Sequence, residues 1–207
     1  MTLFLIENWI EITGALLAVI YLFLSIRGNI WLWVLGFLTS SFYLTIFFKS
    51  QLYADMGLQF YYIVISIYGW FHWLGKRKVH KAPVANIKTT SLSPKAWLVS
   101  LVSVIVLMFI LYGVLLYGPS LLDLPPSDLP LGDAFTTSAS IVATWMLARK
   151  ILENWLFWIV IDIVSLGMYI YKGLYITSLL FLIYSTMAVI GYFQWKRAMN
   201  SQGVLKP

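Results

Sequence analysis

Apolar runs about 20 residues long recur along the whole chain, separated by short charged or turn-rich breaks. A run of that length crosses the ~30 Å hydrocarbon core of a bilayer as one α-helix. The pattern predicts seven such helices, at residues 11–26, 30–48, 53–74, 96–117, 134–151, 154–171 and 175–195. Because a helix satisfies its own backbone hydrogen bonds in lipid, the runs indicate an all-α membrane protein.

Two stretches interrupt the apolar pattern. Residues 75–95 are basic and contain Pro83 and Pro94, which predicts a cytoplasmic linker. Residues 118–133 hold four prolines and three aspartates, which predicts an outer loop that no helix enters. The predicted order is a first three-helix repeat (1–74), the linker, a linker helix (96–117), the loop, a second three-helix repeat (134–195) and a cytoplasmic tail (196–207).

Short matching segments predict that the two triplets are internal repeats. Residues 29–33 (NIWLW) resemble residues 154–158 (NWLFW) at a spacing of 125. The helix face that corresponds to Asn154, Trp158 and Asp162 is then Asn29, Trp33, Phe37, Ser40 and Leu44. Further matches are spaced by 122: Leu52-Tyr53 with Leu174-Tyr175, Gly69 with Gly191, and Trp73 with Trp195. We interpret the change of offset as a small difference in length between the repeats. A single helix between two triplets gives them one orientation, so the plan is 3+1+3 with parallel repeats and a substrate site between them near the midplane.

Composition supports the bilayer as solvent. The chain is 61% hydrophobic, has a mean hydropathy of +0.85 and is only 11% charged, which is too apolar for a soluble domain. It has no cysteine and two histidines, so disulfides, thiolate sites and a histidine metal centre are not expected, and no cofactor is predicted.

The net charge of +6 is an orientation signal. Of the 14 lysines and arginines, only Lys49 and Lys172 fall on the side opposite to the others. The excess of basic residues in cytoplasmic loops therefore predicts an outer N-terminus and a cytoplasmic C-terminus. A nucleic-acid patch is the alternative, but the basic residues are divided among short breaks, so no nucleic-acid partner is expected.

One acid within the apolar runs, Asp162, marks a candidate site. It shares a helix face with Asn154 and Trp158 and lies ~12 Å along the helix from Asn154, close to the midplane. A charged side chain there costs roughly 2.5 to 3.5 kcal/mol on insertion scales and usually faces a cavity or a partner. We interpret Asp162 as a substrate contact; a purely structural buried acid is the alternative.

Aromatic and polar side chains on the third helix of each triplet extend the candidate site. They are Gln59, Tyr62, Ser66, Trp70 and Trp73, with Tyr184 and Trp195 in the second triplet. Amide, phenol and indole groups suit a flat ring with polar edges, and the rings can attract a cation. The alternative for the three tryptophans is an interfacial aromatic belt.

Four segments carry a resemblance to a known family: QLYA at 51–54, YGWFHW at 68–73, RKILENW at 149–155 and KGLY at 172–175. Together with the 3+1+3 plan they resemble the Pnu vitamin transporter family, whose best-known members carry nicotinamide riboside. The resemblance implies a fold like that of SWEET sugar transporters and a homotrimer in the bacterial cytoplasmic (inner) membrane. It also implies facilitated diffusion of a vitamin that is phosphorylated afterwards in the cytosol.

The same resemblance bears on the substrate. Thr39 and Asp162 stand where nicotinamide riboside carriers of the family tend to have asparagines. A carboxylate can accept a hydrogen bond from an aminopyrimidine and balance a positive charge, so we favour thiamine, with nicotinamide riboside as the alternative. Three further alternatives are an ion-coupled carrier in which Asp162 handles a proton, a membrane enzyme, and a scaffold or sensor without transport. The enzyme lacks an evident pair of nucleophile and base.

Overall fold

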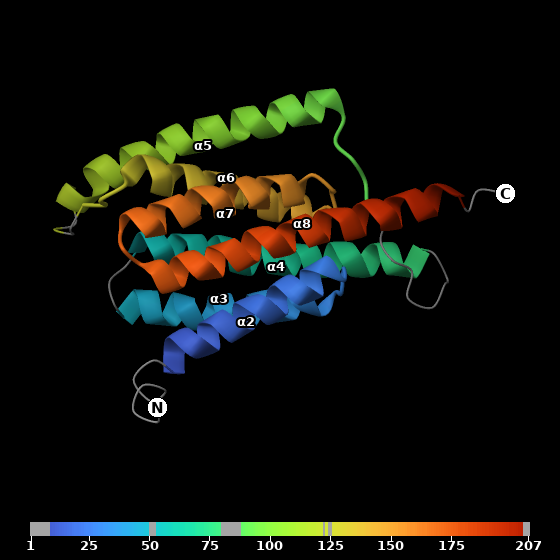
Figure 1. Cartoon of the computed structure of the whole chain (residues 1–207), viewed down its shortest axis with the longest axis horizontal. Helices are drawn as coiled ribbons and strands as arrows, with labels where there is room; N and C mark the ends of the chain where they lie inside the picture. The colour runs from blue at the N-terminus through green and yellow to red at the C-terminus, as the bar shows by residue number, and fades with distance from the viewer. Residues whose placement is uncertain (1–8, 50–52, 80–87, 122, 124–125, 205–207) are drawn as a thin grey trace. The chain divides into compact units, whose positions relative to one another are not determined.

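The computed structural model describes residues 9–49, 53–79, 88–121, 123 and 126–204. Apart from one isolated β-bridge, the regular structure of these residues is α-helical (Figure 1). The helices are α2 (Trp9–Ile26), α3 (Trp31–Lys49), α4 (Tyr53–Val79), α5 (Pro94–Leu121), α6 (Pro130–Ala148), α7 (Asn154–Tyr171) and α8 (Tyr175–Val204). Among the described residues, α5, α7 and Thr177–Ser201 of α8 are long and apolar enough to cross a membrane.

Both predicted breaks are shorter in the structure than in the sequence pattern. The prediction that no helix enters residues 118–133 is wrong at both ends, because α5 continues through Pro119 to Leu121 and α6 begins at Pro130. Pro119 lies in the last turn, where its missing N–H removes one hydrogen bond close to the end of the helix. Pro130 is in the first turn, where a proline leaves no helical bond unmade. Likewise α4 continues past Gly75, while residues 80–87 of the predicted linker and 205–207 of the predicted tail lie outside the described residues.

The chain divides into two compact units, residues 1–87 and 88–207. In the first unit, α3 packs against both α2 and α4. In the second, α5 packs on α6, α6 on α7, and α7 on α8 (Figure 1). The predicted linker helix is α5, and it belongs to the second unit.

The α2–α3 turn and the α6–α7 turn have the same backbone geometry. Gly28 and Lys150 both have positive φ, 61° and 56°, and each donates its N–H to the carbonyl three residues earlier at 2.9 Å. The next amide in each turn donates to the carbonyl five residues earlier: Asn29 to Leu24 at 2.9 Å and Ile151 to Met146 at 3.0 Å. These paired bonds form a Schellman motif that ends both helices. Lys150 stands 122 positions after Gly28.

A pair of perpendicular tryptophans repeats at the same offset. The ring centroids of Trp33 and Trp73 are 5.5 Å apart at 89°, and those of Trp155 and Trp195 are 5.5 Å apart at 90°. The prediction that residues 29–33 match residues 154–158 at a spacing of 125 is therefore wrong, since Trp33 corresponds to Trp155. The predicted length difference between the repeats disappears, because one offset of 122 covers the stretch from the turns to Trp195.

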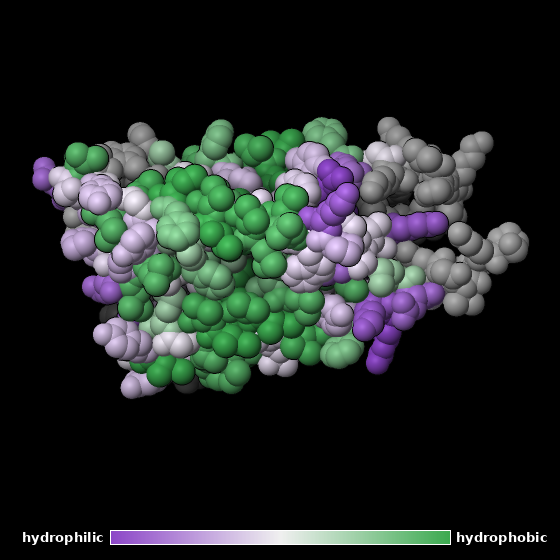
Figure 2. All heavy atoms as spheres, turned by 90° about the horizontal axis from the view of Figure 1, so that it is seen from above, coloured by the Kyte–Doolittle hydropathy of each residue, from purple (hydrophilic) through white to green (hydrophobic). Residues whose placement is uncertain are grey.

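The outward side of the helices is apolar. In α5, Leu98, Val102, Ile105, Phe109 and Ile110 are all exposed. Figure 2 shows apolar atoms over the middle of the face drawn there and hydrophilic atoms toward its ends. A soluble protein rarely exposes so large an apolar surface, whereas lipid chains cover it without cost.

Candidate functional site

Asp162 is buried in the middle of α7. Its side chain is 5% exposed, and within the described part of the chain no hydrogen bond or ion pair satisfies it. At the offset of 122 its counterpart in α3 is Ser40, which is 6% exposed, and not Phe37 as the sequence pattern indicated. The two repeats therefore place a polar side chain at the same position, and only the second makes it a carboxylate. A buried carboxylate without a partner favours a cation or a proton beside it.

Two other predicted site residues, on α3 and α7, donate hydrogen bonds to nearby backbone carbonyls. The Thr39 hydroxyl donates to the carbonyls of Leu35 and Gly36, at 2.8 and 3.1 Å, so its own helix satisfies it. Asn154 is fully buried and its Nδ2 donates to the Ile151 carbonyl at 2.6 Å, which braces the start of α7. Its Oδ1 accepts no hydrogen bond from the described residues.

Trp158 follows Asn154 by one helical turn and is partly buried. It packs against the apolar core that α5, α6 and α7 share, a cluster that includes Ala139, Met146 and Phe157. Trp158 thus contributes to packing of the second unit, whether or not it also touches a solute.

The α4 residues of the candidate site divide into two groups. Gln59 and Tyr62 are half-buried, and Ser66 is buried beside Gly36, where an added Cβ would lie 3.0 Å from the Ser66 hydroxyl oxygen. These three follow one face of α4 away from its end, which is the arrangement that a polar site needs. They remain candidates.

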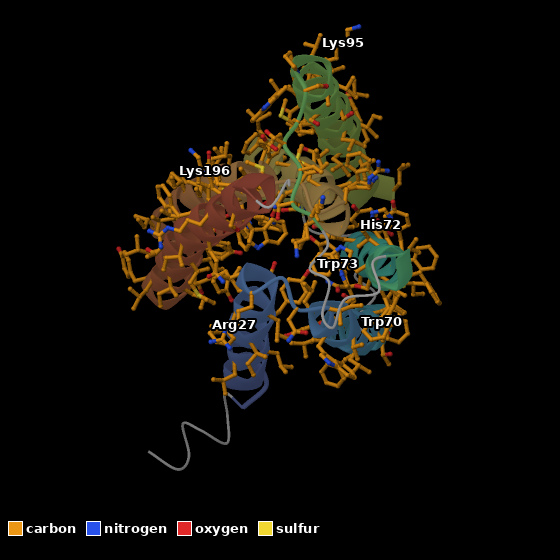
Figure 3. The ribbon with its side chains drawn as sticks, turned by 90° about the vertical axis from the view of Figure 1, so that its right-hand side faces the viewer. Arg27, Trp70, His72, Trp73, Lys95 and Lys196 are labelled. Carbon is orange, nitrogen blue, oxygen red and sulfur yellow. The ribbon has the colours of Figure 1, made fainter. Side chains whose placement is uncertain are left out.

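Trp70 and Trp73 lie in the second half of α4, together with His72; Figure 3 labels all three. Trp70 pairs edge-on with Trp31, whose side chain is 59% exposed, at a centroid distance of 5.8 Å. This pair of one exposed and one half-buried ring suits the interfacial aromatic belt that was the alternative for Trp70. Trp73 is buried against Trp33, which is the role of a packing residue.

In the second unit, Trp195 is the buried equivalent of Trp73. Tyr184 lies deeper, in an aromatic cluster in which Phe181 stands between Tyr184 and Tyr169, at centroid distances of 5.6 and 5.0 Å. Tyr169 belongs to the same helix face as Asp162. Asp162 and Tyr184 thus come from the two helices, α7 and α8, that pack together.

Sequence reasoning missed a pair of buried ionisable groups, Lys150 and Glu153, in the turn before α7. Both are buried, and the Lys150 ammonium lies 5.1 Å from the centroid of the Trp195 ring. Burial lowers the pKa of Lys150 from its ordinary 10.5 to about 8. The constant offset of 122 would have revealed this turn from sequence. It pairs Lys150 with Gly28, and a glycine just after a helix is typical of a left-handed residue that ends it.

Comparisons with known proteins agree with this helical arrangement. The family model described as nicotinamide mononucleotide transporter matches residues 8–197. The nicotinamide riboside transporter PnuC of Escherichia coli (strain K12) is 28% identical, over 95% of this chain and 88% of its own length. The riboflavin/roseoflavin transporter RibM of Streptomyces davaonensis is 26% identical, over 90% of this chain and 84% of its own.

A solved structure shares the fold. The crystal structure of the vitamin B3 transporter PnuC matches with a TM-score of 0.68 at 21% identity, covering 96% of this chain and 85% of that one. At this identity the likeness concerns the fold alone.

Proposed function

We propose, from the premise that this chain belongs to the nicotinamide mononucleotide transporter family, that it carries nicotinamide riboside across a membrane by facilitated diffusion. The resemblance to the Pnu family is confirmed, and the family is one of transporters rather than enzymes. The observation that carries the choice of a cationic solute is the buried Asp162 carboxylate, which no described side chain neutralises.

The preference for thiamine is not supported. The names of the relatives above mention nicotinamide riboside and riboflavin, so they favour the alternative. The chemistry of Asp162 also fits nicotinamide riboside in place of thiamine. Nicotinamide riboside carries a pyridinium charge, a carboxamide and ribose hydroxyls, and a carboxylate can balance the first and accept hydrogen bonds from the others. The feature that suggested thiamine therefore suits the riboside equally well.

In this proposal Asp162 contacts the solute, and Tyr184 of α8, the helix that packs on α7, is a further contact. Gln59, Tyr62 and Ser66 are the contacts we expect from the first repeat. Trp73 and Trp195 act instead as packing residues that hold each third helix against the second.

The distribution of charge within each unit supports a shared orientation of the repeats. In the first unit Arg27 lies in the α2–α3 turn. In the second unit Lys95 is in the first turn of α5, and Lys196 follows Trp195, whose ring lies 5.1 Å from the Lys150 ammonium in the α6–α7 turn. Lys172 lies at the opposite end of the second unit, paired with Asp128 at 3.3 Å. Because basic ends tend to face the cytoplasm, this distribution supports the proposal that both turns lie on the cytoplasmic side, with parallel 3+1+3 repeats and a cytoplasmic C-terminus.

The binding test uses the fluorescence of the ten tryptophans in the purified protein. Titration with nicotinamide riboside, riboflavin and thiamine is expected to give the tightest binding for the riboside. Asp162→Asn keeps the shape of the side chain and removes its charge, so we expect at least about a tenfold loss of affinity, or ~1.4 kcal/mol. Asp128→Asn is the control, because that acid is exposed in the loop before α6 and its loss is expected to leave binding unchanged.

Three outcomes would contradict parts of the proposal. Equal affinity of Asp162→Asn for the riboside would remove Asp162 from the site and leave the family standing. Tight thiamine binding without riboside binding would restore the substrate first expected from the sequence. Tight binding with no flux in liposomes would point to the scaffold or sensor.

A further inference from the structure

Residues 88–93, here called the strap, run from the start of the second unit to α5 and lie against the α6–α7 turn. The Thr90 amide donates to the Lys150 carbonyl at 3.1 Å, and the Leu152 amide donates to the Thr90 carbonyl at 2.9 Å. Thr90 and Ile151 thereby form a parallel β-bridge. The strap is therefore joined to the turn by its backbone.

The side chain of Glu153 completes this junction. It is 7% exposed, and its carboxylate accepts hydrogen bonds from the Ser91 hydroxyl and from the Leu92 amide, the latter at 3.0 Å. Hydrogen bonds to a buried carboxylate are stronger than those between neutral groups, and a buried carboxylate that loses them is left at high cost. Glu153 therefore holds the strap closed.

Apolar contacts carry the junction into the helices. Leu92 and Trp97 pack on the core cluster of the second unit, and Trp97 stacks on Phe157 with centroids 5.8 Å apart at 28°. Trp97 is in the first turn of α5 and Phe157 is in the first turn of α7. The strap thus fixes the beginning of α5 to the beginning of the helix that carries Asp162.

The equivalent turn of the first repeat has no such carboxylate. The position 122 before Glu153 is Trp31, an exposed side chain whose backbone amide donates to Asn29 Oδ1 at 3.0 Å. Within the described residues, a local side chain closes this turn. Both turns have the same backbone geometry, and the α6–α7 turn is the one that is joined to the strap before α5.

We propose that Glu153 is a positioning residue for transport: through the strap it joins α5 to the second repeat, so that α5, α6, α7 and α8 move as one body against the first repeat. The proposal rests on the proposed transport function. It requires the strap to stay closed through the whole transport cycle.

The test exploits the absence of cysteine from the sequence. Thr90→Cys with Ile151→Cys places two thiols on the bridged residues, which oxidation or a short bis-methanethiosulfonate can join. Uptake of nicotinamide riboside into liposomes is measured with the cross-link formed and after reduction, and each single-cysteine variant serves as control. We expect the cross-linked protein to keep its uptake rate within about twofold. A block of uptake that dithiothreitol reverses would overturn the proposal, because the strap would then have to open.

A second arm tests Glu153 itself. Glu153→Ala is expected to lower the maximal uptake rate at least about fivefold with less than a twofold change in KM, and the cross-link is expected to restore the rate. A maximal rate equal to that of the wild type would overturn the proposal. Should Glu153→Ala fail to fold, the cross-linked protein with Glu153 intact still decides the question.

A third arm does not depend on transport. Hydrogen exchange is expected to show that Glu153→Gln exposes the amides of Thr90, Leu92 and Leu152 together, while the amides around Gly191 in α8 stay protected. Unchanged protection of the strap would overturn the junction. If the wild-type protein carries no riboside while the strap amides respond as expected, the failure belongs to the proposed function and not to the strap.

Discussion

Two glycines decide how closely the second and third helices of each repeat approach. A Cβ added at Gly69 would lie 2.5 Å from the ring of Trp33, and one added at Gly191 would lie 2.7 Å from the ring of Trp155. In both cases the indole lies directly against the backbone of the neighbouring helix, an approach that small residues permit in membrane proteins. The same contact occurs twice, 122 residues apart.

We expect Gly69→Ala and Gly191→Ala each to destabilise the fold by about 1 to 3 kcal/mol, because a rigid indole has to shift to admit the methyl group. Thermal unfolding in detergent measures the effect. Gly57→Ala and Gly113→Ala are matched controls, since they lie in helices where an added Cβ meets no atom within 4 Å, and we expect a gain of about 0.5 to 1 kcal/mol from each. An alanine at position 69 as stable as wild type would show that the indole does not lie on the backbone there.

Single residues also show where sequence reasoning stopped. Asp162 could be identified from sequence because a lone acid in an apolar run is costly wherever the helix packs. Its counterpart Ser40 could not, because chance matches among abundant aromatic residues set the register three positions off. The packing roles of Trp73 and Trp195 depend on partners in another helix, which spacing along one helix does not reveal.

At the scale of elements, the two left-handed turns differ in one residue. Gly28 adopts its φ of 61° freely, whereas Lys150 at 56° bears the strain that an L-residue has there, about 1 to 2 kcal/mol. Lys150 also buries an amine whose pKa is lowered to about 8. Between about pH 8 and 10.5 the unfolded chain binds more protons at this residue than the folded one. The contribution of Lys150 to stability therefore rises with pH across that window.

We expect Lys150→Gly to be more stable than wild type near neutral pH by about 1 to 2 kcal/mol, since it relieves the backbone strain. The advantage should narrow as the pH rises from 8 to 10.5, because the wild type then loses its buried charge. Unfolding in detergent at several pH values measures both effects, and Gly28→Ala is the converse control, with a loss of similar size and no change over this window. A less stable Lys150→Gly would mean that the contact with the Trp195 ring outweighs the strain.

The seven helices were predictable because each span needs about 20 apolar residues, which leaves a strong signal. The ends of the helices were harder to predict. α4 passes Gly75 into a run of lysine and arginine, and such residues favour a helical C-terminus. Pro119 marks the last turn of α5 and not the first residue of a loop, because a proline near the end of a helix breaks few bonds.

At the scale of the whole molecule, the chain forms two units of unequal size, with the added helix α5 in the second. The sequence predicted α5 as a separate element because hydropathy identifies a span and not the helix it packs on. Its membership follows from the strap and the core around Trp97, which join residues about 60 positions apart.

We expect saturable uptake of nicotinamide riboside into sealed liposomes with equal initial rates in the presence and absence of a proton or sodium gradient. The reason is that, among the acids in the described residues, Asp162 alone lies away from the ends of a helix, and a proton relay needs more than one such group. Liposomes with Asp162→Asn are the comparison. An absolute requirement for a proton gradient would make the chain an ion-coupled carrier in which Asp162 binds the proton.

The strap has a consequence for how the protein is made. Ser91 and Glu153 are 62 residues apart, so at about 5 to 20 residues per second the ribosome needs about 3 to 12 s to supply the acceptor after the donor has been synthesised. During that interval the first unit is complete while the start of α5 awaits the partners described above. The sequence of α5 is therefore made before the turn that anchors its start exists, so this junction forms late in synthesis.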